Sequence, residues 1–211
     1  MSEYRLHCFA QSGNAYKAAL MLNLCGADWE AHFVDFFNGA HRTPEFRALN
    51  EMGEVPVLEH RGKTLSQSGV ILDYLARRFG KFGWKDEEER REILRWLLWD
   101  NHKLTSYVAT LRFLISFMKT GETPVTEFLR ARVQSTLSIL ERHLEGRAFA
   151  LGSAPTIADI SMCGYLFWPD ELGVSWTDYP TIDAWLERIE ALPGWVHPYE
   201  LMPGHSLPAK A

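Results

Sequence analysis

The stretch GEVPVLEHRGKTLSQSGVILDYL, residues 53–75, decides the fold of the first part of this chain. Residues 55–59 and 63–65 flank His60-Arg61-Gly62, a pattern that predicts two strands joined by a tight hairpin turn. From Ser68 to Phe79 apolar side chains recur at helical spacing, which predicts a helix with one buried face. The stretch therefore reads as a hairpin followed by a helix.

The residues before this stretch add alternating strands and helices. Residues 4–9 and 30–36 have strand-like patterns, and residues 15–25 are rich in the helix formers Ala, Leu and Met, with Gly26 as a stop. Thr43-Pro44-Glu45 has the cap residue and first-turn proline of a short helix. The order βαβαββα predicts an α/β layered domain with a mixed sheet over residues 1–80.

After the break at residues 80–83 the pattern becomes purely helical. The charged segment 86–91 leads into about 30 residues of helical pattern, which predicts one long or kinked helix. Apolar stripes over 125–144 and 182–192 predict two more helices. We therefore expect an all-α domain over residues 86–211.

Thr156 and Asp159 have the spacing of a capping box, with Asp in place of the usual Glu. Each side chain can accept a hydrogen bond from the backbone N–H of the other residue, and the carboxylate suits the positive end of a helix. We expect this pair to serve folding, not chemistry.

Composition narrows the classes of function. Hydrophobic residues make up 46% of the 211 residues and charged residues 23%, as in an ordinary globular protein. A net charge of -5 argues against a nucleic-acid or membrane-surface partner, since either favours a basic face. The three cysteines form no CxxC pair, the eight histidines show no metal-ligand spacing, and the first residues contain no apolar signal segment. We expect no metal and a cytoplasmic location.

Three segments, taken together and in this order, resemble the glutathione S-transferase superfamily. Residues 53–58 resemble the family's x-V-P-x-L strand entry, whose proline is cis, and residues 65–75 resemble its L-x-[EQ]-S-x-A-I-x-x-Y-L segment. The box at 156–159 falls where the family's second domain carries one. The resemblance covers nearly the whole chain and is closest to bacterial, serine-type, theta/nu-like members. It implies a thioredoxin-like first domain, an all-helical second domain and a homodimer.

The resemblance also implies a glutathione site. Val55 and Pro56 would present main-chain groups with which the extended tripeptide pairs as with a strand edge. Gln67 and Ser68, at the start of the third helix, would hold the γ-glutamyl carboxylate, since free N–H groups and the helix dipole favour an anion there. Taken alone, Pro56 would be a turn proline and Ser68 a helix cap.

The thiol end of glutathione is expected next to Ser12. This serine follows the first strand, as does the serine that donates to the thiolate in several classes of the family, and Asn14 is a second candidate donor. The alternative for Ser12-Gly13-Asn14 is a simple turn and cap. Tyr16 is a minor candidate, and Cys8 lies within the strand, which argues against a cysteine-type site.

The glycine end departs from the family pattern. His41 and Arg42 offer cations in the loop after the second strand, but the residue before Val55 is Glu54, which would repel a carboxylate unless it points to solvent.

The sequence thus predicts a glutathione transferase that joins glutathione, as co-substrate, to a small hydrophobic electrophile. Two alternatives stay open. One is glutathione-dependent disulfide or peroxide reduction, or dehalogenation, on the same site. The other is a non-catalytic binding or dimerisation module of the same fold.

Overall fold

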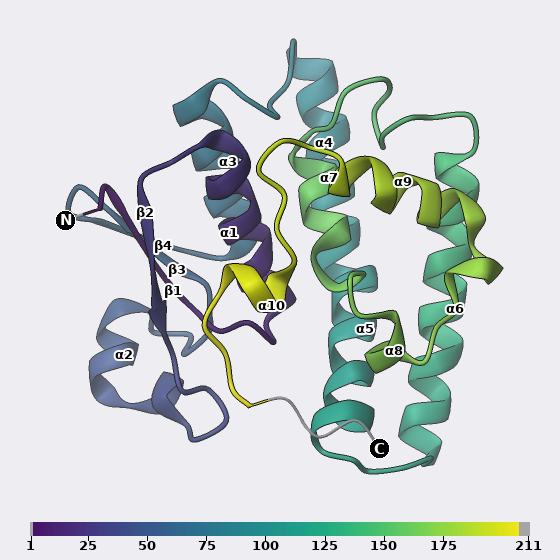
Figure 1. The fold of residues 1–211 in the computed structure, drawn as a ribbon, viewed down its shortest axis with the longest axis horizontal. Helices are drawn as coiled ribbons and strands as arrows, with labels where there is room; N and C mark the ends of the chain where they lie inside the picture. The colour runs from purple at the N-terminus through teal and green to yellow at the C-terminus, as the bar shows by residue number, and fades with distance from the viewer. Residues whose placement is uncertain (1, 207–211) are drawn as a thin grey trace. The chain divides into compact units, whose positions relative to one another are not determined.

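The computed structural model describes residues 2–206, which divide into two compact units. One unit comprises the described residues up to Lys81 together with those from Leu192 on, and the other comprises Phe82–Ala191 (Figure 1). The boundary near residue 80 lies where the sequence pattern changes to a purely helical one. The segment after 191 differs from the expected division, because Tyr16 donates to the Val196 carbonyl (3.0 Å) and Asn23 to the Gly194 carbonyl (2.6 Å). These bonds join it to the first unit and not to the helical domain predicted for 86–211.

The first unit contains a four-stranded mixed sheet. Its strands β1 (Tyr4–Cys8), β2 (Trp29–Phe33), β3 (Val57–His60) and β4 (Lys63–Ser66) lie in the order β2-β1-β3-β4. β1 runs parallel to β2 and antiparallel to β3, and β4 closes the predicted hairpin. β1 thus lies between two neighbouring strands, and the chain passes from its end into the first helix.

Helices cover both faces of this sheet. α1 (Gly13–Cys25) and α3 (Ser68–Phe79) lie side by side on one face, and α2 (Pro44–Leu49) lies on the other (Figure 1). Under α2, Phe46 packs with Val34 and Val57 in a small apolar core. The short α10 (Pro198–Leu201) packs on α1. The predicted βαβαββα order is confirmed.

The second unit is helical throughout its described length. Its helices are α4 (Glu87–Trp99), α5 (Thr105–Arg112), α6 (Pro124–Leu144), α7 (Ile157–Met162), α8 (Pro169–Leu172) and α9 (Pro180–Glu190). An α/β thioredoxin-like domain followed by an all-α domain is thus the observed fold class. No described helix has the combination of length and apolar character needed to cross a membrane.

Two π-helical turns, Asp100–Leu104 and Phe113–Phe117, kink the long helix that begins with α4. In the first, fully buried Asp100 accepts hydrogen bonds from Thr105 Oγ1 (2.8 Å) and Ser161 Oγ (2.5 Å). Just before the second, buried Arg112 pairs with Glu171 (2.7 Å). Asp100 and Arg112 are therefore part of the helical core.

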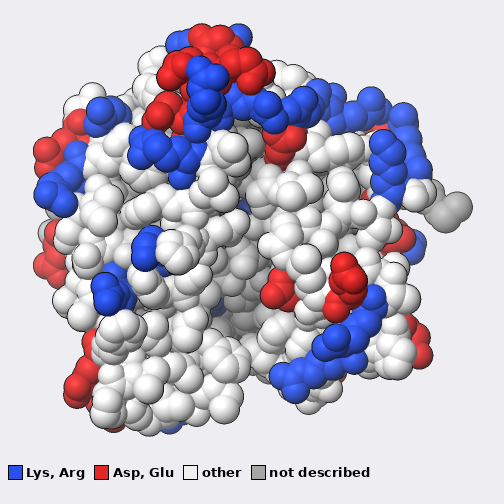
Figure 2. All heavy atoms as spheres, turned by 180° about the vertical axis from the view of Figure 1, so that it is seen from behind, with Lys and Arg blue, Asp and Glu red and all other residues white. Residues whose placement is uncertain are grey.

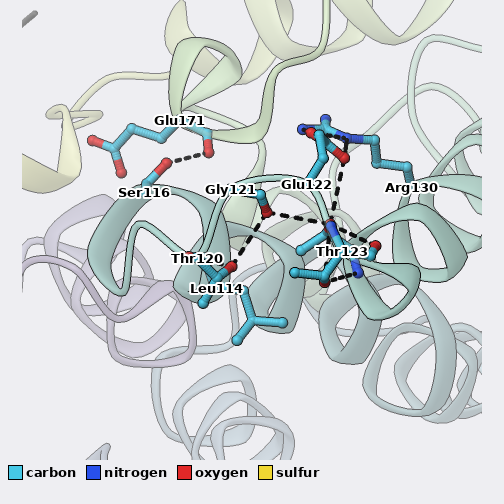
Figure 3. A network of polar contacts seen from close by, with 9 residues as sticks. Leu114, Ser116, Thr120, Gly121, Glu122, Thr123, Arg130 and Glu171 are labelled. Atoms are coloured by element: carbon cyan, nitrogen blue, oxygen red, sulfur yellow. Dashed lines mark hydrogen bonds and ion pairs between the residues drawn. The ribbon is translucent and has the colours of Figure 1, made fainter.

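The chain then turns sharply into α6 through a polar loop (Figure 3). Ser116 donates to the Glu171 carbonyl (2.6 Å), and Thr120 donates to the Leu114 carbonyl (3.2 Å). Thr123 caps α6, while Arg130 reaches back from α6 to Glu122 (2.6 Å). The Thr120 and Thr123 bonds satisfy backbone groups at the end of one helical segment and at the start of α6.

Charges of both signs are interspersed on the face shown in Figure 2. They crowd together at the top of that view, where α4 begins, and there Glu88 pairs with Arg91 and Glu92 with Arg95 (2.7 Å). Such exposed i,i+3 pairs stabilise a helix by only about 0.2–0.5 kcal/mol each.

The capping box at the start of α7 is confirmed, and it does more than cap. The Thr156 N–H donates to Asp159 Oδ2 (2.8 Å), and Thr156 Oγ1 accepts from the Ala158 N–H (3.2 Å). Asp159 is fully buried and also accepts from the Ala150 N–H (2.7 Å) and from Trp185 Nε1 (3.0 Å). Burial raises the pKa of this carboxyl group, and these donors oppose the shift. One side chain thus joins α7, α9 and the loop before α7.

Asp159→Ala should lower the free energy of unfolding of the helical unit by about 3 kcal/mol or more, because three buried N–H donors each lose a partner at a cost of about 1–3 kcal/mol. Thr156→Ala, the matched control, removes the cap and a 3.3 Å hydrogen bond to Asp159 but leaves the carboxylate in place, and should cost about 0.5–2 kcal/mol. Urea denaturation followed by tryptophan fluorescence measures both. Equal losses for the two variants would contradict the central role of Asp159.

Candidate functional site

The turn between β1 and α1 places Ser12 at the first turn of the helix. Its N–H donates to the Phe9 carbonyl (3.0 Å), and its Oγ accepts from the Ala15 N–H (3.1 Å). A serine hydroxyl also has one hydrogen to donate, and within the described part of the chain that hydrogen has no acceptor. Ser12 is therefore a helix cap that retains a donor for a ligand.

Asn14 and Ser68 join the starts of α1 and α3. Ser68 Oγ donates to Asn14 Oδ1 over 3.4 Å, a long hydrogen bond between residues 54 positions apart. Because the bond engages the oxygen of the Asn14 amide, the NH₂ group of that amide is left to donate elsewhere. Ser68 is 5% exposed. The positive ends of two helices thus meet at one point of the first unit.

Neither of these helices carries an acid in its first turn. The other described α-helices that follow a non-helical segment all do; these acids include Glu45, Glu87, Glu127, Asp159, Asp170, Asp183 and Glu200. α3 also has no side-chain cap. Free N–H groups and the helix dipole therefore favour an external anion where α1 and α3 meet.

The loop before β3 contains the cis peptide bond Val55–Pro56. Buried Asn50 holds this loop, since its Nδ2 donates to the Glu54 carbonyl (2.8 Å) and its Oδ1 accepts from the Met52 N–H (3.2 Å). Sequence reasoning missed Asn50, which no motif marks. The N–H and C=O of Val55 take part in no backbone hydrogen bond within the described residues.

Gln67 occupies a backbone region that is rare for a residue with a side chain, with φ at 68°. Such a conformation costs about 1–3 kcal/mol and is concentrated at functional sites. Its Nε2 donates to Glu54 Oε2 (3.0 Å). Glu54, expected to disturb the site, is thus tied to Gln67 at the surface.

His41 and Arg42 form a 3₁₀ turn, η1 (Ala40–Arg42), but differ in character. His41 is 8% exposed and stacks on Phe36 with the ring centres 3.9 Å apart. Burial, aided by the Arg42 charge, lowers the pKa of His41, and its Nε2 accepts from Arg42 Nε (3.2 Å). At neutral pH the exposed Arg42 is therefore the cation of this pair, and His41 is neutral.

Two other side chains near Ser12 are poor candidates for chemistry. Tyr16 is fully buried and donates to the Val196 carbonyl, away from the turn. Burial raises the pKa of the Cys8 thiol to about 12, so this cysteine stays protonated. Both observations agree with the sequence-based preference for Ser12 and Asn14.

A chain of contacts brings the predicted residues together. Ser12 and Asn14 share the first turn of α1, and Asn14 bonds Ser68. The neighbouring Gln67 bonds Glu54, which lies next to Val55 and Pro56.

The η1 turn lies against the same loop, because a Cβ on Gly53 would come within 3.0 Å of the His41 carbonyl. That closeness and the positive φ of 65° explain the glycine. Among the described residues no group of three or more His, Cys, Asp or Glu is placed to hold a metal ion.

Comparison with known proteins decides the family. The model of the glutathione S-transferase N-terminal domain matches residues 3–77, and that of the C-terminal domain matches residues 103–193. The chain belongs to the glutathione S-transferase family. The predicted superfamily is thereby confirmed, and the serine-type, theta/nu-like class stays a prediction.

Several relatives of this transferase-family chain span its length. Glutathione S-transferase F14 of Arabidopsis thaliana is 29% identical over 99% of this chain and 90% of its own length. The disulfide-bond oxidoreductase YfcG of Escherichia coli is 27% identical over 88% and 87%. The crystal structure of a glutathione S-transferase from Pseudomonas fluorescens superimposes with a TM-score of 0.88 at 33% identity, covering 94% of this chain and 100% of that one.

The His41 assignment can be tested by titration. We expect an NMR pKa below the ordinary value of about 6.5, and Arg42→Gln should raise it only in part, because burial is the larger cause. The depressed value means that the neutral ring favours the folded state above the ordinary pKa, and that this contribution is lost as the pH falls toward the folded-state pKa. A pKa at or above about 6.5 in the folded protein would contradict the lowering of the His41 pKa by burial.

Proposed function

We propose that this chain is a glutathione transferase, in which the sulfur of bound glutathione attacks an electrophilic carbon of a small hydrophobic substrate. The observation that carries the proposal is the meeting of two helix N-termini without acids beside Ser12. Glutathione supplies two anionic groups for them, its γ-glutamyl carboxylate and its thiolate.

The tripeptide fits the site from end to end. Its γ-glutamyl carboxylate lies at the start of α3, where it accepts from the adjacent free N–H groups and from the Ser68 hydroxyl, which gives up its long bond to Asn14 in the complex. Gln67 Oε1 accepts from the glutathione ammonium, because Glu54 engages the Nε2 of the same amide. The Val55 main chain pairs with the peptide as a strand edge would. The glycine carboxylate turns to Arg42, with His41 packed behind it.

The thiol lies at Ser12. A free thiol has a pKa near 8.5, and lowering it by two units requires about 2.7 kcal/mol in favour of the thiolate. A hydroxyl donor from Ser12, the amide of Asn14 and the N-terminus of α1 supply interactions of this size. The thiol proton passes to solvent, the sulfur–carbon bond forms, and the leaving group departs with its electron pair.

Disulfide reduction through bound glutathione is the second candidate. The similarity to YfcG, whose name is that of a disulfide-bond oxidoreductase, favours it. Both reactions need the same thiolate at Ser12. A mixed-disulfide substrate and an aryl halide, assayed side by side with glutathione, distinguish them.

We further propose that the protein is a cytoplasmic homodimer. The three cysteines are buried and outside any disulfide bond within the described residues, which suits a reducing compartment. In the first unit α3 exposes Val70, and in the second α4 exposes Leu94 and Leu98 one turn apart, which are apolar positions suited to self-association.

Ser68→Ala should weaken glutathione binding by about 1.5–3 kcal/mol, the value for a hydrogen bond to a charged group. Titration calorimetry on the wild type and the variant measures this difference. An unchanged Kd in a folded variant removes Ser68 from the site.

Ser12→Ala should raise the pKa of the bound glutathione thiol, read from thiolate absorbance in the ultraviolet, and slow turnover about 10- to 10³-fold. Glutathione affinity should change less, because the carboxylate contacts remain. Asn14→Ala is the matched variant: a larger pKa rise there would make Asn14 the principal donor. If neither variant moves the pKa, the backbone N–H groups activate the thiol without a side-chain donor.

A further inference from the structure

The end of the described chain returns to the turn that carries Ser12. The Ala10 N–H donates to the Pro203 carbonyl (2.8 Å). The side chain of Gln11 then pairs with the main chain of His205, donating from Nε2 to its carbonyl (2.8 Å) and accepting at Oε1 from its N–H (3.1 Å). Two hydrogen bonds thus join the side-chain amide of Gln11 to the main chain of a residue 194 positions away.

Gly204 fits between these bonds because it has no side chain. A Cβ at this position would lie 2.7 Å from the Ala10 Cβ and 2.9 Å from Gln11 Oε1. Both distances are shorter than van der Waals contact, so any larger residue would push the segment and the turn apart. The backbone at Gly204 does not require a positive φ, which leaves the close approach as the reason for glycine.

The ring of His205 anchors the segment on the same unit. It stacks on Phe37 with the ring centres 4.3 Å apart and packs edge-on against Phe9 and Phe33. Its Nε2 accepts from the Phe37 N–H (3.4 Å), and its Nδ1 faces Asp35 Oδ1 (3.6 Å). The contacts reach the residues that follow β1 and those that follow β2, so the segment fixes both.

We propose that residues 203–205 position the Ser12 hydroxyl for the bound thiol, with Gln11 as the positioning residue. The inference rests on the proposed function. Ser12 follows Gln11 directly, and its own N–H bonds Phe9, so a shift of residues 9–11 moves its hydroxyl. A misplacement of about 1 Å in a reacting group can cost about 10²-fold in rate. The carboxylate contacts come from another element, the start of α3.

The test uses Gly204→Ala and Gln11→Ala in the full chain, with Ser206→Ala as the matched control at an exposed neighbour. Both test variants should lower kcat with an aryl halide about 10-fold or more and leave the KM for glutathione within about twofold. They should also raise the pKa of the bound thiol by about one pH unit, since the donor moves away. Ser206→Ala should leave all three unchanged. A titration midpoint does not depend on the fraction of folded protein, so reduced stability does not blur the result.

Hydrogen exchange tests the contact itself, independently of catalysis. A chain ending at Met202 should lose protection at the Ala10 amide, whereas one ending at Ser206 should keep it. A wild-type thiol pKa and kcat in both Gly204→Ala and Gln11→Ala would overturn the positioning role. If the wild type itself binds no glutathione, the proposed function fails, while the exchange data still decide whether the segment holds the turn.

Discussion

The first unit depends on one constraint, which is that the N-termini of two helices meet at one place and neither carries an acid in its first turn. The Asn14–Ser68 hydrogen bond holds the starts of α1 and α3 together. Neither helix has an acid in its first turn, although the other described α-helices that follow a non-helical segment do, α2, α4 and α6 among them. Uncompensated N–H groups at two converging helix ends raise the free energy of the empty site and favour an anion. Three other features hold groups around this point. They are the strained backbone of Gln67, the bond from Gln67 to Glu54, and the contacts of residues 203–205 with the turn before Ser12.

The two units contain buried polar groups with different purposes. In the helical unit Asp159 and Asp100 accept hydrogen bonds from several elements, and their partners are protein groups. Such fully satisfied groups fix the relative positions of helices. In the first unit, Ser12 and the amide of Asn14 retain donors without a described acceptor. Donors that are held in place yet unsatisfied are what a ligand site needs.

Much of the fold could be predicted from the sequence because it depends on local patterns. The hairpin and helix of residues 53–79, the capping box at Thr156 and the long helix from residue 86 all follow from spacing within a few residues. The places of Ser12 and Ser68 at helix starts were also predictable, whereas their roles come from the family resemblance and stay a prediction. The π turns were not predictable, because such turns are rare and no residue type in the sequence marks them.

What the sequence could not predict depends on contacts between distant residues. Glu54 reads as a repelling charge until its bond to Gln67, 13 residues on, is seen. Residues from Leu192 on read as part of the helical domain, because only tertiary hydrogen bonds from Tyr16 and Asn23 place them on the first unit. His41 reads as a cation, whereas its ring is buried against Phe36 and this burial lowers its pKa.

The central claim is that glutathione binds where α1 and α3 begin. Two-dimensional ¹⁵N NMR of the full chain, titrated with S-methylglutathione, tests it most directly, because the methylated sulfur prevents turnover. The account predicts that the largest shifts fall on the backbone amides of Gly13, Asn14, Val55, Ser68 and Gly69. Saturable shifts confined to other residues, or no saturable shift at millimolar ligand, would contradict it.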